Sequence, residues 1–291
     1  MNLQTLIPIV LKLSIVLNVF TIGLRASPQD ATYLFRRPID LFRALLGMNL
    51  LMPLFALGLV SVFDLDPAVK IALVALSVSP IPPLLPKKVV KAGGAGSYGI
   101  GLLVAVGLLA ILFIPLAMEI IERVRKEPLQ MSATSIASLI FMTVLLPIGL
   151  GIAVHSFVPA LAERVANPVS QIAVMVLLVC VVAILVSAAP AIWTLVGNGT
   201  LLTLAAFVLF GLAIGHLLGG PVPENRTALA LSTASRHPGI ALALAQANFP
   251  EQKLAMAAVL LYLVVNAMVS IPYLSWTNGR QSVVADKVKA A

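Results

Sequence analysis

Residues 68–88 have the sequence AVKIALVALSVSPIPPLLPKK, in which an apolar run meets four prolines and then two lysines. A proline lacks a backbone N–H and its ring clashes with the preceding helical turn, so a regular helix cannot continue through Pro80, Pro82, Pro83 and Pro86. About 11 to 12 residues before Pro80 can be helical, which is roughly half a bilayer at about 1.5 Å per residue. The sequence therefore predicts a broken membrane helix here.

A second interrupted run lies at residues 227–247, with the sequence TALALSTASRHPGIALALAQA. Its two apolar stretches are separated by polar and helix-breaking residues, namely Ser235, Arg236, His237, Pro238 and Gly239. Arg236 would lie near mid-membrane, where an arginine costs roughly 2.5–3.5 kcal/mol or more unless it faces a polar cavity. The position favours a functional role for Arg236, whereas His237 fits a structural hydrogen bond as well as proton transfer.

The composition places these two runs in a membrane protein. Of 291 residues, 60% are hydrophobic and 10% are charged, which is more apolar surface than a soluble core of this size requires. The apolar runs are long and continuous rather than alternating, so they predict helices and not barrel strands. The fold class is therefore an all-α, polytopic membrane protein. Its single cysteine, Cys180, lies in an apolar run and is expected to pack there.

A bilayer core requires about 20 apolar residues per helix. With proline, glycine and charged residues as boundaries, nine runs are predicted to span the membrane, at residues 5–24, 39–63, 68–91, 98–121, 131–157, 167–187, 190–218, 227–249 and 252–276. The first run has no basic segment before it and no small-residue cleavage site after it, so we expect it to be a mature span. Residues 1–291 are predicted to form one transmembrane domain.

The two broken runs are the third and the eighth, an odd offset, so two four-helix units around the fifth run would have opposite orientations. The expected inverted repeats cover residues 5–121 and 167–276, with a linker helix at 131–157. Interrupted helices at matching positions of such repeats indicate the binding site of a secondary transporter. The alternative for the third run is a kinked but continuous span, with Lys87 and Lys88 anchored at the cytoplasmic headgroups.

The distribution of basic residues predicts the orientation. A cytoplasmic C-terminus places eight of them inside: Arg25, Arg36, Arg37, Arg164, Arg226, Arg280, Lys287 and Lys289. It leaves four outside: Arg123, Arg125, Lys126 and Lys253. Because cytoplasmic loops hold the excess of Lys and Arg, we expect the N-terminus outside and the C-terminus in the cytoplasm, in an inner or plasma membrane.

Several short motifs are similar to those of a known family. They are Asn18-Val-Phe-Thr-Ile-Gly23-Leu24, Arg37-Pro38, Met52-Pro53-Leu54, Pro147-Ile-Gly-Leu-Gly151 and Pro238-Gly239-Ile-Ala241. Together they resemble the bile acid:sodium symporter family over nearly the whole chain. The resemblance implies a transporter of nine or ten helices with a panel and a core domain, two broken helices that cross in the core, and organic anions carried with sodium.

The chain departs from the family pattern at both breaks. Where the family's first crossing helix carries Pro-Gly-Gly and ends in Ser-Asn, residues 82–88 are PPLLPKK. Where its second has Glu, three residues and then Gln-Asn, this chain has Ser232, Arg236 and His237. Sodium prefers several hard oxygen ligands, and a fixed cation in the same space would repel it by about 4 kcal/mol at about 4 Å, with an effective dielectric of about 20.

The eleven acidic residues all fall in predicted loops or near helix ends, so none pairs with Arg236 at mid-membrane. We therefore hypothesise that the sodium sites are lost and that Arg236, with Lys87 or Lys88, supplies the positive charge for a small organic anion. Transport would then be sodium-independent, or coupled to protons through a lysine or His237. The candidate binding residues are Arg236, His237, Ser232, Ser235, Lys87, Lys88, Asn18 and Asn266. No cofactor or structural metal is implied.

Other functions remain as alternatives. A sodium-coupled organic anion symporter, an anion channel or uniporter with Arg236 in a selectivity ring, and a receptor without transport all fit the fold. An arsenite permease requires a cysteine in its first broken helix. This chain has none at residues 80–91, so that function is disfavoured. An enzyme is disfavoured because HExxH, GxSxG, P-loop and paired intramembrane carboxylates are missing from the sequence. The net charge of +8 is scattered between apolar runs, which disfavours a nucleic-acid partner.

Overall fold

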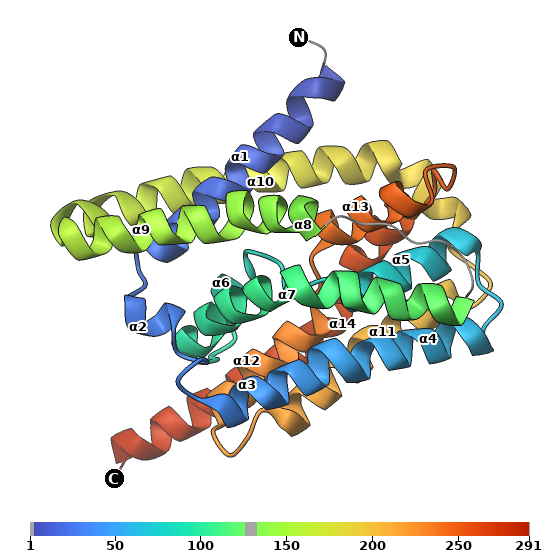
Figure 1. Cartoon of the computed structure of the whole chain (residues 1–291). Coiled ribbons are helices and arrows are strands. Elements are labelled where there is room, and N and C mark those ends of the chain that lie inside the picture. The colour runs from blue at the N-terminus through green and yellow to red at the C-terminus, as the bar shows by residue number, and fades with distance from the viewer. Residues whose placement is uncertain (1–2, 126–132, 291) are drawn as a thin grey trace.

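The computed structural model describes residues 3–125 and 133–290, and the side chains of residues 7–123 and 134–279. Over these residues all the regular secondary structure is helical, as the composition predicts (Figure 1). Lys126, which the predicted orientation leaves outside, and Met131, at the start of the predicted fifth run, lie outside the described residues.

The first half of the chain contains α1 (Leu3–Gly23), α2 (Pro28–Ala31), α3 (Pro38–Leu45), η1 (Leu46–Leu51), α4 (Met52–Val62), α5 (Pro67–Val78), α6 (Leu85–Lys91) and α7 (Gly96–Arg125). The second half contains α8 (Ala133–Ile140), η2 (Phe141–Leu145), α9 (Leu146–Phe157), α10 (Pro159–Thr194), α11 (Thr200–Leu218), α12 (Pro223–Ala234), α13 (Pro238–Asn248) and α14 (Ala255–Ala290). The elements η1 and η2 are π-helical and continue α3 into α4 and α8 into α9.

Six helical stretches of the described chain are long and apolar enough to cross a membrane: Pro38–Val62, Gly96–Arg123, Thr134–Phe157, Pro159–Thr194, Thr200–Leu218 and Ala255–Gly279. Two shorter apolar helices cover Ile7–Gly23 and Pro67–Val78. The most lipid-like surface belongs to α10, whose large apolar side chains Ile172, Met175, Val179 and Val186 are exposed. The chain is thus a polytopic helical membrane protein.

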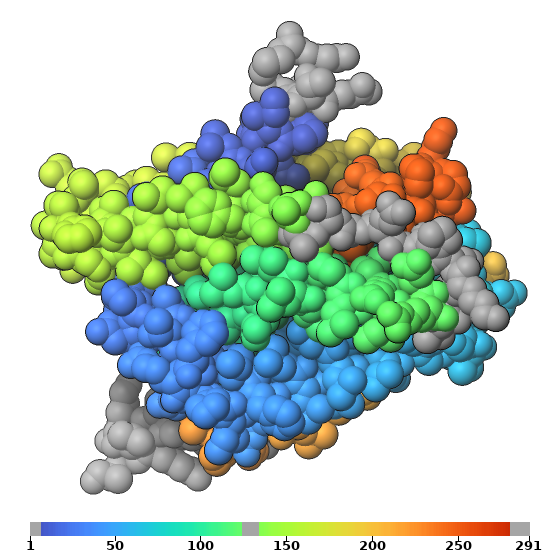
Figure 2. All heavy atoms as spheres, in the orientation of Figure 1, coloured from blue at the N-terminus to red at the C-terminus, as the bar shows by residue number. Residues whose placement is uncertain are grey.

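The helices α1, α9 and α10 pack on one another and form a layer, which we call the three-helix layer (Figure 1). The space-filling view shows the α8–α9 band lying along the band formed by α7, with α3 and α4 beyond it (Figure 2). Within the layer, α1 and α9 approach closely at Gly23 and Gly151. A Cβ atom on Gly151 would lie 2.4 Å from the Phe20 carbonyl oxygen, so only glycine fits this contact.

This contact makes a direct prediction for stability. We expect Gly151→Ala to lower the free energy of unfolding in detergent by about 1–3 kcal/mol, because the added methyl group forces the two backbones apart. The matched control is Gly149→Ala on the same helix, where a Cβ atom would meet nothing within 4 Å. That change should raise helix stability by up to about 1 kcal/mol. Equal thermal unfolding of the two variants would contradict the contact.

The helices α3 to α7 and α11 to α14 form what we call the main bundle, in which α11 packs against α12. A Cβ atom on Gly211 would lie 2.7 Å from the Ala234 Cα, and one on Gly215 would lie 2.5 Å from the Ala230 Cα. Small residues at four-residue spacing on both helices allow this backbone contact, as in other membrane helix pairs. The contact fixes Ala234, the last residue of α12, against α11.

The predicted boundary between the sixth and seventh runs is wrong. The sequence suggested a connection between residues 187 and 190, but α10 continues through Pro190 to Thr194. The chain turns instead at Gly197, Asn198 and Gly199, whose φ angles are 145°, 41° and 78°. Membrane helices tolerate an internal proline because neighbouring groups and local adjustments satisfy the freed carbonyl. Three successive positive φ angles, by contrast, require residues such as glycine and asparagine.

Candidate functional site

Both predicted interruptions are breaks in the helical backbone. α5 ends at Val78 after 12 residues and α6 begins at Leu85. Pro80, Pro82 and Pro83 lie in the gap, while Pro86 lies in the first turn of α6, where a missing N–H costs nothing. The fragment before the break thus has the length that the proline positions predict.

The second break is shorter. α12 ends at Ala234, and α13 begins at Pro238, with Gly239 in its first turn. The arms have 12 and 11 residues, so each is about 16–18 Å long at about 1.5 Å per residue. Arg236 therefore lies between two half-helices of nearly equal length.

The two breaks meet through their backbones. The N–H of His237 donates a hydrogen bond to the Pro80 carbonyl oxygen at 2.8 Å. The half-helix α5 packs against α13, and α6 packs against α12. Backbone groups that the breaks release from helical hydrogen bonding are thus brought together inside the protein, as required for irregular backbone at membrane depth.

Arg236 is buried at this meeting point, with 1% of its surface exposed. One guanidinium nitrogen donates to the carbonyl oxygen of Ser79, just after the C-terminal end of α5, at 3.2 Å. The other donates to the Met48 carbonyl oxygen, in the π-helical segment η1, at 3.1 Å. A half-helix C-terminus carries partial negative charge, so the guanidinium fills a position that suits a cation.

Two residues of α14 satisfy the backbone of the second break. The Tyr262 hydroxyl accepts from the Arg236 N–H at 2.9 Å and donates to the Ala234 carbonyl at 2.7 Å. Asn266 Nδ2 donates to the same carbonyl at 2.7 Å. Tyr262, Asn266 and Ser270 are spaced at four-residue intervals, so they lie along one face of α14.

This arrangement predicts the effect of Tyr262→Phe. The change leaves the Arg236 N–H without its acceptor in a buried position, which should cost about 1–3 kcal/mol of unfolding free energy. Far-UV circular dichroism of the purified variant during heating measures the loss. An unchanged melting curve would mean that the hydroxyl contributes nothing at the break.

Lys88 lies beside this α14 face. Its ammonium donates to Asn266 Oδ1 at 3.4 Å and to Ser270 Oγ at 3.3 Å, both long for charged donors. Lys87 points elsewhere, because successive residues on a helix do not face the same way. Both lysines are half-buried, and their ammonium groups donate to side chains of other helices.

Lys87 joins the main bundle to the three-helix layer. Its ammonium donates to Asn18 Oδ1 at 2.7 Å, to Thr21 Oγ1 at 3.0 Å and to Ser170 Oγ at 2.8 Å. These three bonds use all the donors of an ammonium group. Lys87 is thus fully hydrogen-bonded between α6, α1 and α10, whereas Lys88 is not.

The other predicted site residues differ in how they are used. Ser232 is fully buried in α12 and donates to the Ala228 carbonyl of its own helix at 2.7 Å. His237 is the N-cap of α13, and its Nδ1 accepts from the Ile240 N–H at 3.2 Å. The Ser235 hydroxyl, the Arg236 Nε and the His237 Nε2 are buried without a hydrogen-bond partner among the described residues.

The ion pairs of the described side chains lie away from the breaks. They join Arg43 to Asp40, Lys70 to Asp64 and Arg123 to Glu119. None includes Lys87, Lys88 or Arg236, so the cationic groups of the site are held by neutral oxygens. The interior therefore carries positive charge that a bound anion would neutralise.

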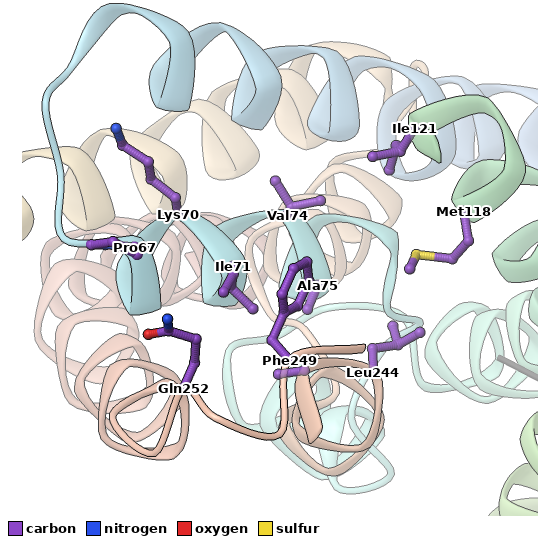
Figure 3. A pocket seen from close by; sticks show the side chains of 11 residues that line it. Pro67, Lys70, Ile71, Val74, Ala75, Met118, Ile121, Leu244, Phe249 and Gln252 are labelled. Atoms are coloured by element: carbon purple, nitrogen blue, oxygen red, sulfur yellow. The ribbon is translucent and has the colours of Figure 1, made fainter. Parts of the chain in front are cut away.

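A separate cavity of about 370 Å³ lies between α5, α13 and the end of α7 (Figure 3). Its lining is mostly apolar, with Ile71, Val74 and Phe249 around it and Lys70 and Gln252 at one end. The predicted site residues do not line it.

Sequence reasoning missed Met48, Ser79, Tyr262 and Ser170. Met48 and Ser79 contribute backbone carbonyls, which have no residue signature. Ser170 lies on a face of α10 whose role becomes apparent only from its hydrogen bond with Lys87. Tyr262 had a usable signal, because it lies four residues before Asn266 in the same apolar run.

The comparison with known protein families gives one match. A sequence model described as the Sodium Bile acid symporter family matches residues 12–195, more than half of the chain. No curated protein matches the chain at a significant level.

Proposed function

The chain belongs to the sodium bile acid symporter family, and from that premise we propose that it is a secondary transporter of a small organic anion that works without sodium. The observation that carries the proposal is the buried Arg236 guanidinium, which donates to Ser79 and Met48 carbonyl oxygens at the crossing of two broken helices. In broken-helix transporters such carbonyls and half-helix C-termini hold the coupling cation.

The residues present at this crossing do not suit sodium. Sodium binds several oxygen ligands at short range, and here the oxygens already accept from a fixed cation. A sodium ion at about 4 Å from the guanidinium would meet a repulsion of about 4 kcal/mol at an effective dielectric of about 20. Arg236 thereby replaces the ion permanently, and Lys88, whose hydrogen bonds are long, offers the charge that attracts the substrate.

The proposal includes the architecture. We propose nine membrane crossings, namely the six long spans, α1 and the two interrupted segments. The matching breaks support two inverted repeats, at residues 5–121 and 167–276, joined by the fifth span in a single domain. The loop charges support an outer N-terminus and a cytoplasmic C-terminus in an inner or plasma membrane.

Sodium-coupled symport is the second candidate, because the family is described as one of sodium symporters. The two candidates differ in a measurement that requires no knowledge of the substrate. We expect purified protein to bind no radioactive sodium in a saturable manner. Saturable sodium binding would overturn the substitution by Arg236 and favour symport.

Transport itself is tested in proteoliposomes. The substrate is chosen as the radiolabelled compound that gives the largest thermal shift in a screen of small carboxylates and sulfonates. Uptake should saturate, show counterflow and be independent of a sodium gradient. Uptake that neither saturates nor shows counterflow would indicate a channel, and binding without uptake would indicate a receptor.

A further inference from the structure

Three consecutive residues of the second break carry unpartnered polar atoms: Ser235 Oγ, Arg236 Nε and His237 Nε2. Ser235 is 6% exposed and His237 is 8% exposed, so neither atom is satisfied by bulk water. A buried donor without a partner costs about 1–3 kcal/mol, and in a native protein it usually indicates a ligand or an ordered water.

The hydrogen bond within α13 fixes the tautomer of His237. The Ile240 N–H donates to Nδ1, so Nδ1 holds a lone pair. In the neutral imidazole the proton is therefore on Nε2, which makes the unpartnered atom a donor. Gly239 leaves room for the ring, because a Cβ atom there would lie 3.2 Å from His237 Cε1.

The backbone angles of the break predict that Ser235 and His237 point to the same side. Ser235 has φ −102° and ψ 128°, and His237 has φ −74° and ψ 104°, both extended. In an extended segment alternate residues point the same way, so Arg236 points opposite to its two neighbours. Arg236 is turned toward Ser79 and Met48, so this alternation predicts that Ser235 and His237 point to the other side.

A cation lies near this pair. The side-chain amide of Asn266 accepts from the Lys88 ammonium at 3.4 Å and donates to the Ala234 carbonyl at 2.7 Å. One amide group therefore separates Lys88 from the residue that precedes Ser235. Two neutral donors with an incompletely bonded ammonium nearby are suited to an oxyanion with a single charge.

We infer that Ser235 Oγ–H and His237 Nε2–H form a subsite that binds one carboxylate group of the substrate, with Lys88 as the nearby countercharge. The inference rests on the proposed anion carrier and assigns its substrate to the small monocarboxylates. It also separates two roles within the break, because Arg236 takes the place of the coupling cation at the crossing while its two neighbours bind the ligand. No proton is transferred, since His237 donates as a neutral imidazole.

Two substitutions at His237 separate ligand binding from helix capping. In His237→Asn the shorter side chain still caps the Ile240 N–H, since asparagine is a good N-cap, but nothing reaches the Nε2 position. In His237→Gln the longer amide can place an N–H near Nε2, while the cap is lost. If His237 is purely structural, the Asn variant should be closer to the unchanged protein. If His237 binds a carboxylate, the Gln variant should retain more of the binding.

The experiment titrates the full-length protein in sodium-free detergent solution with propionate, with propionamide as the uncharged control. Saturation-transfer NMR gives the affinity, and ¹⁵N-histidine spectra report the Nε2 proton of His237. We expect Ser235→Ala and His237→Asn each to weaken propionate binding about tenfold. His237→Gln should bind propionate within about threefold of the unchanged protein and melt at a lower temperature.

Three results would overturn the subsite: propionate binding that is equal in all variants, equal binding of propionamide, or no saturable propionate binding. Failure of the proposed function is distinguishable, since it would show as saturable sodium binding to the same preparation. A protein that binds sodium and still loses propionate in His237→Asn would retain the subsite but not the cation replacement.

Discussion

Arg236→Met is expected to lower uptake by at least about 100-fold while changing stability little, and this combination marks Arg236 as functional. The change leaves the Ser79 and Met48 carbonyl oxygens without donors, at about 1–3 kcal/mol each. It also removes a buried cation, whose desolvation costs several kcal/mol. These two effects on folding oppose each other, whereas the loss of positive charge at the crossing acts on transport alone.

The control for Arg236→Met is Arg236→Lys. Lysine keeps the charge but offers a single ammonium in place of a planar fork, so it should retain part of the uptake. Proteoliposome uptake of the screened carboxylate and thermal unfolding in detergent are measured on both variants. Full uptake by the methionine variant, or equal loss in both variants with a collapsed melting temperature, would contradict the role of Arg236 as a resident cation.

The backbone breaks could be predicted because their causes are local. Pro80, Pro82 and Pro83 each lack an N–H, and Pro238 starts a helix more readily than it continues one, so the chain positions follow from covalent structure. The end of α10 could not be placed in the same way. Pro190 has the same local chemistry as Pro80, and tertiary neighbours decide that one helix continues while the other stops.

The partners of the site could be predicted only in part. Arg236 was found because a mid-membrane charge is rare, and Asn266 because polar residues are rare in spans. Their acceptors were not found, since the Ser79 and Met48 carbonyls belong to the fold and not to a residue type. The contacts of Lys87 and Lys88 could not be predicted for a similar reason. Their spacing on a helix shows that they point in different directions, but it does not show which neighbouring helix each one contacts.

The two adjacent lysines are expected to respond differently to substitution. Lys87 donates three hydrogen bonds of 2.7–3.0 Å to Asn18, Thr21 and Ser170, which join α6 to the three-helix layer. Lys87→Met leaves these buried acceptors without their donor, and it should lower the free energy of unfolding by about 1–3 kcal/mol. Uptake measured well below the melting temperature should fall less than about tenfold, because the contact is structural.

Lys88 should behave in the opposite way. Its hydrogen bonds of 3.4 and 3.3 Å to Asn266 and Ser270 are too long to contribute much to folding, so Lys88→Met should melt near the temperature of the unchanged protein. The same change removes the ammonium charge that Asn266 links to the second break, and uptake should fall about 100-fold. Lys88→Arg serves as the charge-preserving control. If Lys87→Met abolished uptake in a stable protein while Lys88→Met left uptake intact, the anion would have to bind at the contact between α6 and the three-helix layer, because that is where the remaining ammonium group lies.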